Sequence, residues 1–211
     1  MSESQHPVVT LHGTERSGHV HRVVLLLRML EIPYRFVGAP AEVRRTPEFR
    51  LLNPLGEIPV LQDGTAIICD SNAILVYLAK RYAPGSAWLP EEPLAAAHVQ
   101  RWLSIAAGEI KHGPALARAI AQWRDPGDPG SATRIAGRVL GFMNAHLADR
   151  TYLAAGHPTI ADLACYAYTA HAPEGGISLQ PYPALRSWHS RIEALPRFEP
   201  MPRSPLPPEI S

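Results

Sequence analysis

The segment that most constrains the fold of this chain is a short apolar run that opens on Ile58-Pro59 and is followed by Asp63-Gly64. Proline cannot donate a hydrogen bond to a neighbouring strand, so Pro59 belongs at the start of a strand or on the edge of a sheet. Asp-Gly between two apolar runs is a strong signal for a tight turn. The sequence therefore predicts a β-hairpin with strands over 58–61 and 65–68.

A helix is expected directly after this hairpin. Asp70-Ser71 offers side-chain oxygens that can accept hydrogen bonds from the first N–H groups of a helix, which we place over 73–82. Hairpin and helix together present a backbone edge, a helix N-terminus, and a carboxylate beside a hydroxyl. The edge and the helix end can hold an extended peptide, and the carboxylate with its hydroxyl can meet a charged end of that peptide.

The residues before the hairpin alternate between strand and helix signals. We predict strands over 8–12 and 34–37, a helix that Ser17 or Thr14 caps and that runs to residue 31, and a weaker helix over 41–52. A strand–helix–strand unit of this kind is parallel and right-handed. The first 83 residues are therefore expected to form a small α/β domain, with helices on both faces of its sheet.

The strand signals stop at a linker with several prolines, over 84–93. Helices are predicted beyond it over 94–122 with a break or kink near Gly113-Pro114, and over 131–149, 163–171 and 182–195. Thr159-x-x-Asp162 fits a capping box at the start of the third of these helices, and we interpret it as a folding element. An all-helical domain over 94–211 follows from this pattern.

Charge and hydropathy argue against several classes of function. The 211 residues include 20 basic and 19 acidic side chains, and a net charge of +1 argues against a nucleic-acid or anionic-membrane binder. The longest apolar run, 23–27, is far shorter than the ~20 residues that span a bilayer. Residues 1–7 lack the apolar core of a signal peptide. We expect a soluble, cytoplasmic protein with no membrane or nucleic-acid partner.

The sequence gives little reason to expect a metal. The two cysteines, Cys69 and Cys165, lie far apart and form no Cys-x-x-Cys pair, which argues against a zinc ribbon or a dithiol redox site. His19 and His21 are two residues apart, and on a helix such residues do not face each other. The prediction is therefore no metal site.

Three motifs, taken together, resemble the cytosolic glutathione S-transferases. They are Asn53-Pro54, Ile58-Pro59-Val60-Leu61 and Asp70-Ser71-Asn72-Ala73-Ile74. The resemblance runs from about residue 8 to residue 201. It implies an α/β thioredoxin-like N-terminal domain followed by an all-α C-terminal helical domain, and a cis peptide bond before Pro59. It also implies a homodimer, with the helices after Asp70 and from Leu94 near the interface.

The resemblance implies that glutathione is the co-substrate and that residues around the hairpin bind it. The Ser71 hydroxyl and N–H would bind the γ-glutamyl carboxylate, helped by the helix dipole, and Asp70 would bind the α-ammonium group. Ile58 and Pro59 would present the edge that pairs with the cysteinyl backbone. Taken alone, Asp70-Ser71 favours a plain helix cap over a ligand site. Together with Pro59 upstream, it favours both roles.

Ser17 is the candidate catalytic residue. Ser17-x-x-x-x-Arg22-Val23 resembles the pattern of the serine-type transferases, in which a hydroxyl before the first helix stabilises the glutathione thiolate. A free thiol has a pKa of ~8.5, and a hydroxyl donor at a helix N-terminus favours the nucleophilic thiolate. The alternative is that Ser17 only caps the helix. No tyrosine or cysteine lies in 8–24 to support another mechanism.

Five further residues are candidates on weaker grounds. Arg45 would meet the glycyl carboxylate of glutathione, unless it is only a surface cation. Glu57 is a further candidate for glutathione binding. Ser104, Lys111 and His112 fall in a segment that resembles one found at the active site of beta-class relatives, although Ser104 replaces an asparagine there and the Lys-His order is reversed. We assign these three to the walls of the electrophile site.

The predicted function is a glutathione transferase that stabilises the glutathione thiolate and conjugates it to a small hydrophobic electrophile, as in detoxification. Two alternatives remain open: glutathione-dependent reduction of peroxides or disulfides, and a glutathione-fold protein that binds without catalysis.

Overall fold

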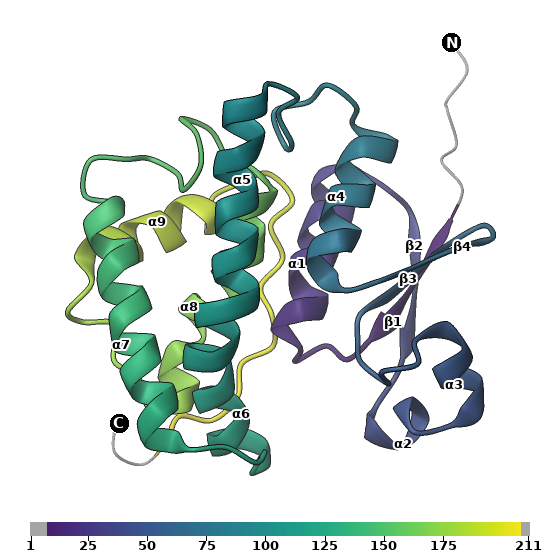
Figure 1. Ribbon diagram of the computed structural model, residues 1–211, viewed down its shortest axis with the longest axis horizontal. Helices are drawn as coiled ribbons and strands as arrows, with labels where there is room; N and C mark the ends of the chain where they lie inside the picture. The colour runs from purple at the N-terminus through teal and green to yellow at the C-terminus, as the bar shows by residue number, and fades with distance from the viewer. Residues whose placement is uncertain (1–7, 208–211) are drawn as a thin grey trace.

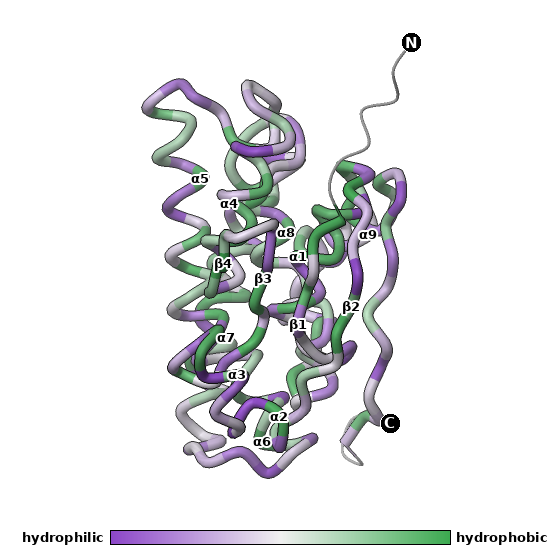
Figure 2. The backbone as a smooth tube through the Cα atoms, turned by 90° about the vertical axis from the view of Figure 1, so that its right-hand side faces the viewer, coloured by the Kyte–Doolittle hydropathy of each residue, from purple (hydrophilic) through white to green (hydrophobic). Residues whose placement is uncertain are grey.

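The computed structural model describes residues 8–207, which form a four-stranded sheet followed by a bundle of helices (Figure 1). The strands are β1 (Val9–Gly13), β2 (Tyr34–Gly38), β3 (Val60–Asp63) and β4 (Ala66–Cys69), in the order β2-β1-β3-β4. β1 and β2 are parallel, whereas β3 is antiparallel to both β1 and β4. Figure 2 shows the four strands side by side, in front of the helices.

The sheet follows the predicted pattern closely. β3 and β4 form the expected hairpin, with Gly64 in its turn at a φ of 58° that glycine adopts without steric cost. Val9 and Leu11 of β1 are fully buried, as alternation along a half-covered strand requires. β3 begins at Val60, directly after the cis Ile58–Pro59 bond. Pro59 therefore lies just before the strand, where no ladder hydrogen bond is lost.

Two helices cover the face of the sheet that meets the bundle. These are α1 (Gly18–Met29) and α4 (Ser71–Tyr82), which pack on each other and lie between the sheet and the bundle in Figure 1. The single helix predicted over 41–52 was wrong. It is split into α2 (Ala41–Arg44) and α3 (Pro47–Leu52), because the Thr46 hydroxyl accepts a hydrogen bond from Phe49 N and starts a new helix with proline in its first turn.

The rest of the chain is helical, as predicted. Its elements are α5 (Pro93–Ile105), η1 (Ala106–Ala115), α6 (Leu116–Trp123), α7 (Pro129–His146), α8 (Ile160–Ala170), η2 (Ala172–Gly175) and α9 (Pro183–Glu193). The chain does not break at Gly113-Pro114 but widens into the π-helix η1, in which the proline is accommodated. A Cβ atom on Gly113 would lie 2.8 Å from the backbone N of Ala136, so a glycine is needed where η1 meets α7.

Helix α8 forms the centre of the bundle and packs against α1, α5 and α9. Its N-terminus is the predicted capping box, with Thr159 and Asp162 both fully buried. The Asp162 carboxylate accepts hydrogen bonds from Thr159 N at 2.9 Å and from Leu153 N and Trp188 Nε1 at 3.0 Å. One carboxylate thus joins the start of α8 to the preceding loop and to α9.

The C-terminal segment after α9 runs back across the molecule along α1 (Figure 1, yellow). His21 Nε2 lies 2.7 Å from the Glu199 carbonyl oxygen, and the Arg28 guanidinium pairs with the Glu199 carboxylate at 2.7 Å. Further on, the Ser204 hydroxyl accepts a hydrogen bond from Arg118 Nη2 of α6. The segment therefore ties the sheet-bearing part of the chain to the bundle.

Replacing Asp162 with alanine is expected to lower the free energy of unfolding by about 3 kcal/mol or more, because several buried donors lose their acceptor. Denaturant unfolding would measure the change, with Asp149→Ala at an exposed aspartate as the control. An unchanged stability would contradict the interpretation. So would a stable, folded Asp162→Ala protein without turnover, which would indicate a catalytic role.

Candidate active site

A cavity of about 220 Å³ lies where the loop before β3, the start of α4, the first turns of α1 and the helix η1 meet. Six of the residues predicted from the sequence line it: Glu57, Ile58, Pro59, Asp70, Ser71 and Lys111. His19, Arg22, Asn53, Leu55, Cys69, Asn72 and Ala107 complete its walls. The structure therefore brings the proposed peptide edge and the proposed helix N-terminus to a single cavity.

The N-terminus of α4 forms one end of the cavity. Asp70 Oδ1 accepts hydrogen bonds from Asn72 N at 2.9 Å and Ala73 N at 3.0 Å, so the predicted cap is present. Asp70 itself has a φ of 70°, a conformation that non-glycine residues adopt only where the surroundings enforce it and that is common at functional sites. The N–H of Ser71, in the first turn, points out of the helix end, where an anion is favoured.

Arg22 is a site residue that sequence reasoning left without a role. It is only 1% exposed, and its Nη1 donates to Ser71 Oγ at 3.1 Å and to Asn72 Oδ1 at 2.8 Å. Its Nε and Nη2 are buried without a hydrogen-bond partner among the described residues. Burial lowers the pKa of Arg22, but a guanidinium stays protonated because that pKa starts far above neutrality. The cavity thus has a desolvated cation in its wall.

His19 also faces the cavity, from the first turn of α1. Its Nδ1 lies 3.4 Å from Ser71 Oγ, and its ring packs edge-on against the Tyr168 ring, with centroids 4.9 Å apart. Burial lowers the pKa of His19 well below its usual value, and the charges of Arg22 and Lys111 lower it further. The imidazole is therefore neutral at physiological pH.

Ser17 caps α1, and its hydroxyl accepts a hydrogen bond from Val20 N at 3.4 Å. The phenolic group of Tyr168 in α8 lies next to the same hydroxyl. Ser17 is not among the residues that line the cavity. Gly18, next to it, lies against the Tyr168 ring, where an added Cβ would come within 2.8 Å of a ring carbon. Packing of α8 thus determines the position of the loop that carries Ser17.

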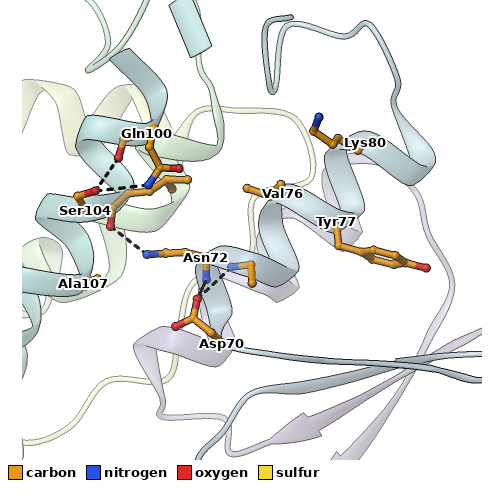
Figure 3. A pocket seen from close by; sticks show the side chains of 10 residues that line it. Asp70, Asn72, Val76, Tyr77, Lys80, Gln100, Ser104 and Ala107 are labelled. Atoms are coloured by element: carbon orange, nitrogen blue, oxygen red, sulfur yellow. Dashed lines mark hydrogen bonds between the residues drawn. The ribbon is translucent and has the colours of Figure 1, made fainter. Parts of the chain in front are cut away.

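Three of the weaker candidates lie away from this cavity. Arg45 ends α2 with an exposed side chain, and His112 is exposed on η1. Ser104 lines a second cavity of about 610 Å³ between α4 and α5, where its hydroxyl donates to the Gln100 carbonyl oxygen at 3.1 Å (Figure 3). Asn72 reaches between the two helices and donates from Nδ2 to the Leu103 carbonyl oxygen at 3.0 Å.

A buried ionic network supports the loop before α1 from behind. Arg118 Nε pairs with Glu174 Oε2 at 2.6 Å, and both side chains are almost fully buried. Arg118 Nη1 donates to the Arg16 carbonyl oxygen at 2.9 Å, and Glu174 Oε1 lies 2.6 Å from His171 Nδ1. The network thereby fixes the backbone directly before Ser17 to the helical bundle.

Within residues 8–207, no group of three or more His, Cys, Asp or Glu side chains is arranged to hold a metal ion. No helix in the same range is both long and apolar enough to cross a membrane.

Comparison with known proteins identifies the family. The N-terminal domain model of the glutathione S-transferases matches residues 11–87, and their C-terminal domain model matches 128–196. A crystal structure of a glutathione S-transferase from Pseudomonas fluorescens has a TM-score of 0.86 and 32% sequence identity, covering 92% of this chain and 99% of that one. A Drosophila mojavensis glutathione transferase homologue with bound glutathione has a TM-score of 0.81 and 27% identity, covering 90% and 89%.

The Escherichia coli glutathione S-transferase GstB is 25% identical over 90% of this chain and 95% of its own. Fold and cavity define a two-domain protein with a thioredoxin-like half and a helical half. The chain belongs to the glutathione S-transferase family, as its motifs predicted.

Replacing Arg118 with methionine should lower the free energy of unfolding by about 3–5 kcal/mol, because it leaves the buried Glu174 carboxylate without its guanidinium partner. Denaturant unfolding would measure this loss. Arg138→Met is the matched control, because Arg138 pairs with Glu109 at the surface and its loss should cost less than about 1 kcal/mol. Equal effects of the two substitutions would show that the network does not stabilise the fold.

Proposed function

We propose that this protein is an enzyme that conjugates glutathione to a small electrophile. The observation that carries the proposal is the meeting of three features in one cavity: the Ile58–Pro59 edge, the α4 N-terminus capped by Asp70, and the buried Arg22 cation. Glutathione offers an extended backbone, a carboxylate and an ammonium group that match these features. The names of the curated and structural relatives support the same activity.

The ends of glutathione can be assigned by charge. We propose that the γ-glutamyl carboxylate binds at the Ser71 N–H, where the helix dipole and Arg22 favour an anion. Asp70 would bind the α-ammonium group, and Ile58, beside Pro59, would pair with the cysteinyl backbone. Glu57 lines the same cavity as a further polar contact. Arg45 remains the proposed partner of the glycyl carboxylate, which requires its exposed side chain to turn toward the ligand.

Catalysis would consist of thiolate stabilisation and positioning. The glutathione thiol loses its proton to water, the sulfur lone pair forms a bond to the electrophile, and the leaving group departs with its electron pair. We propose that the Ser17 hydroxyl stabilises the thiolate, for which its proton has to turn from Tyr168 toward the ligand. Lys111 lines the cavity from η1 and would form part of the electrophile wall, with Ser104 and His112 as more distant candidates.

The assembly and the cellular setting are further parts of the proposal. We propose a homodimer that uses the groove between α4 and α5, a cavity with exposed small side chains such as Ala73 and Ala107 on its walls. A cytoplasmic detoxification role with a small hydrophobic co-substrate fits this proposal.

The test of the proposed function is a glutathione titration in which thiolate absorbance is followed against pH. Wild-type protein should bind glutathione and lower its thiol pKa clearly below ~8.5, and Ser17→Ala should lose much of that shift. Thr46→Ala is the matched control, because it removes a cap of the same kind from α3, outside the cavity. Failure of the wild type to bind glutathione would refute the proposal. If the wild type binds glutathione without lowering its thiol pKa, the protein binds glutathione but does not activate its thiol.

Asp70→Asn separates ligand binding from helix capping. Asparagine is an equally good cap, so stability should change by less than about 1 kcal/mol. The dissociation constant of glutathione should rise at least about tenfold, because the carboxylate partner of the α-ammonium group is lost. Isothermal calorimetry with glutathione and with its deaminated analogue would measure this. If Asp70→Asn still prefers glutathione over the analogue as strongly as the wild type does, Asp70 does not bind the ammonium group.

A further inference from the structure

The wall of the cavity formed by α1 presents His19, whereas Ser17 is turned toward Val20 N and Tyr168. We infer that the His19 imidazole is a second catalytic residue, which donates a hydrogen bond from Nε2 to the sulfur of bound glutathione. This inference rests on the proposed function, because it concerns the same thiolate.

His19 lies on the side of the cavity toward which the thiol of bound glutathione is expected to point. An extended peptide that begins at Ser71 and pairs with the Ile58 edge directs its central side chain away from the backbone edge. The other walls of the cavity are formed by His19 and Arg22 of α1 and by Ala107 and Lys111 of η1. The cysteinyl thiol therefore points toward the wall in which His19 lies.

We place the imidazole proton of His19 on Nε2. Arg22 Nη1 donates to Ser71 Oγ at 3.1 Å, which leaves the Ser71 hydroxyl proton free to point at His19 Nδ1, 3.4 Å from that oxygen. With Nδ1 as the acceptor of this proton, Nε2 carries the N–H of the neutral ring. The Ser71 backbone N–H stays available for the γ-glutamyl carboxylate. Nε2–H is thus a donor whose partner remains to be supplied by the ligand.

Burial and the neighbouring charges make His19 a hydrogen-bond donor and not a base. Burial of the ring disfavours a positive imidazolium most, Arg22 of the same helix and Lys111 of η1 disfavour it further, and Tyr168 of α8 covers one side of the ring. The other titratable groups on the cavity are Glu57, Asp70 and Cys69. The same cations that keep His19 neutral attract a thiolate. The thiol proton therefore leaves to water, and His19 stays neutral and donates to the sulfur.

Two substitutions at His19 distinguish the effect of its N–H donor from the effect of its ring packing. His19→Phe keeps a ring against Tyr168 but has no N–H, whereas His19→Gln keeps an N–H donor of similar reach. We expect His19→Phe to raise the thiol pKa of bound glutathione by about one unit, a tenfold loss of thiolate below that pKa. His19→Gln should retain most of the wild-type pKa. His157→Phe, at an exposed loop histidine, is the control and should behave like the wild type.

Thiolate absorbance against pH gives the thiol pKa, and calorimetry at about pH 5, where the thiol is protonated, confirms that each variant still binds glutathione. The acid limb of kcat/KM with a chlorodinitrobenzene as electrophile should move to higher pH in His19→Phe by the same amount. A purely structural role would lower kcat/KM equally at every pH. A wild-type thiol pKa in His19→Phe, or an equal rise in His19→Phe and His19→Gln, would overturn the inference. Absence of glutathione binding by the wild type would instead refute the proposed function itself.

Discussion

The buried guanidinium of Arg22 joins the parts of the molecule that form the cavity. From α1 it donates to Ser71 and Asn72 at the start of α4, and Asn72 in turn donates to the Leu103 carbonyl oxygen of α5. A cation that is almost fully removed from water is costly unless it finds partners, so the three helices are constrained to keep these contacts. Its Nε and Nη2 are buried without a hydrogen-bond partner among the residues that the structure describes.

The second constraint is the packing of α8 on the beginning of α1. Tyr168 covers Gly18, contacts the His19 ring edge-on and lies next to Ser17. Arg118 holds the backbone carbonyl just before these residues, through a network that includes Glu174. The loop that carries the proposed catalytic residues is therefore shaped by the helical bundle, although it belongs to the sheet-bearing part. Through these contacts, the helical bundle determines the shape of a site whose residues belong largely to the sheet-bearing part of the chain.

Local signals predicted most of the elements that form the site. Proline before a strand, Asp-Gly in a turn and a capping residue before an apolar helix act over a few residues, so Pro59, Gly64, Asp70 and Thr159 could be placed without tertiary information. The split between α2 and α3 also had a local signal, since Thr46 precedes a proline that suits a first helical turn. The helical pattern over 41–52 outweighed this signal in the prediction.

Sequence patterns established the family, the order of elements and the backbone features of the peptide-binding edge, because each depends on near neighbours in the chain. They did not establish which side chains meet in the cavity. Arg22 lies among apolar residues of α1, and only the packing of α4 and α8 around that helix shows that its charge is buried beside Ser71. Ser17 caps α1 and His19 lies in its first turn, so contacts with Tyr168 and Ser71, distant in sequence, determine which of them faces the cavity.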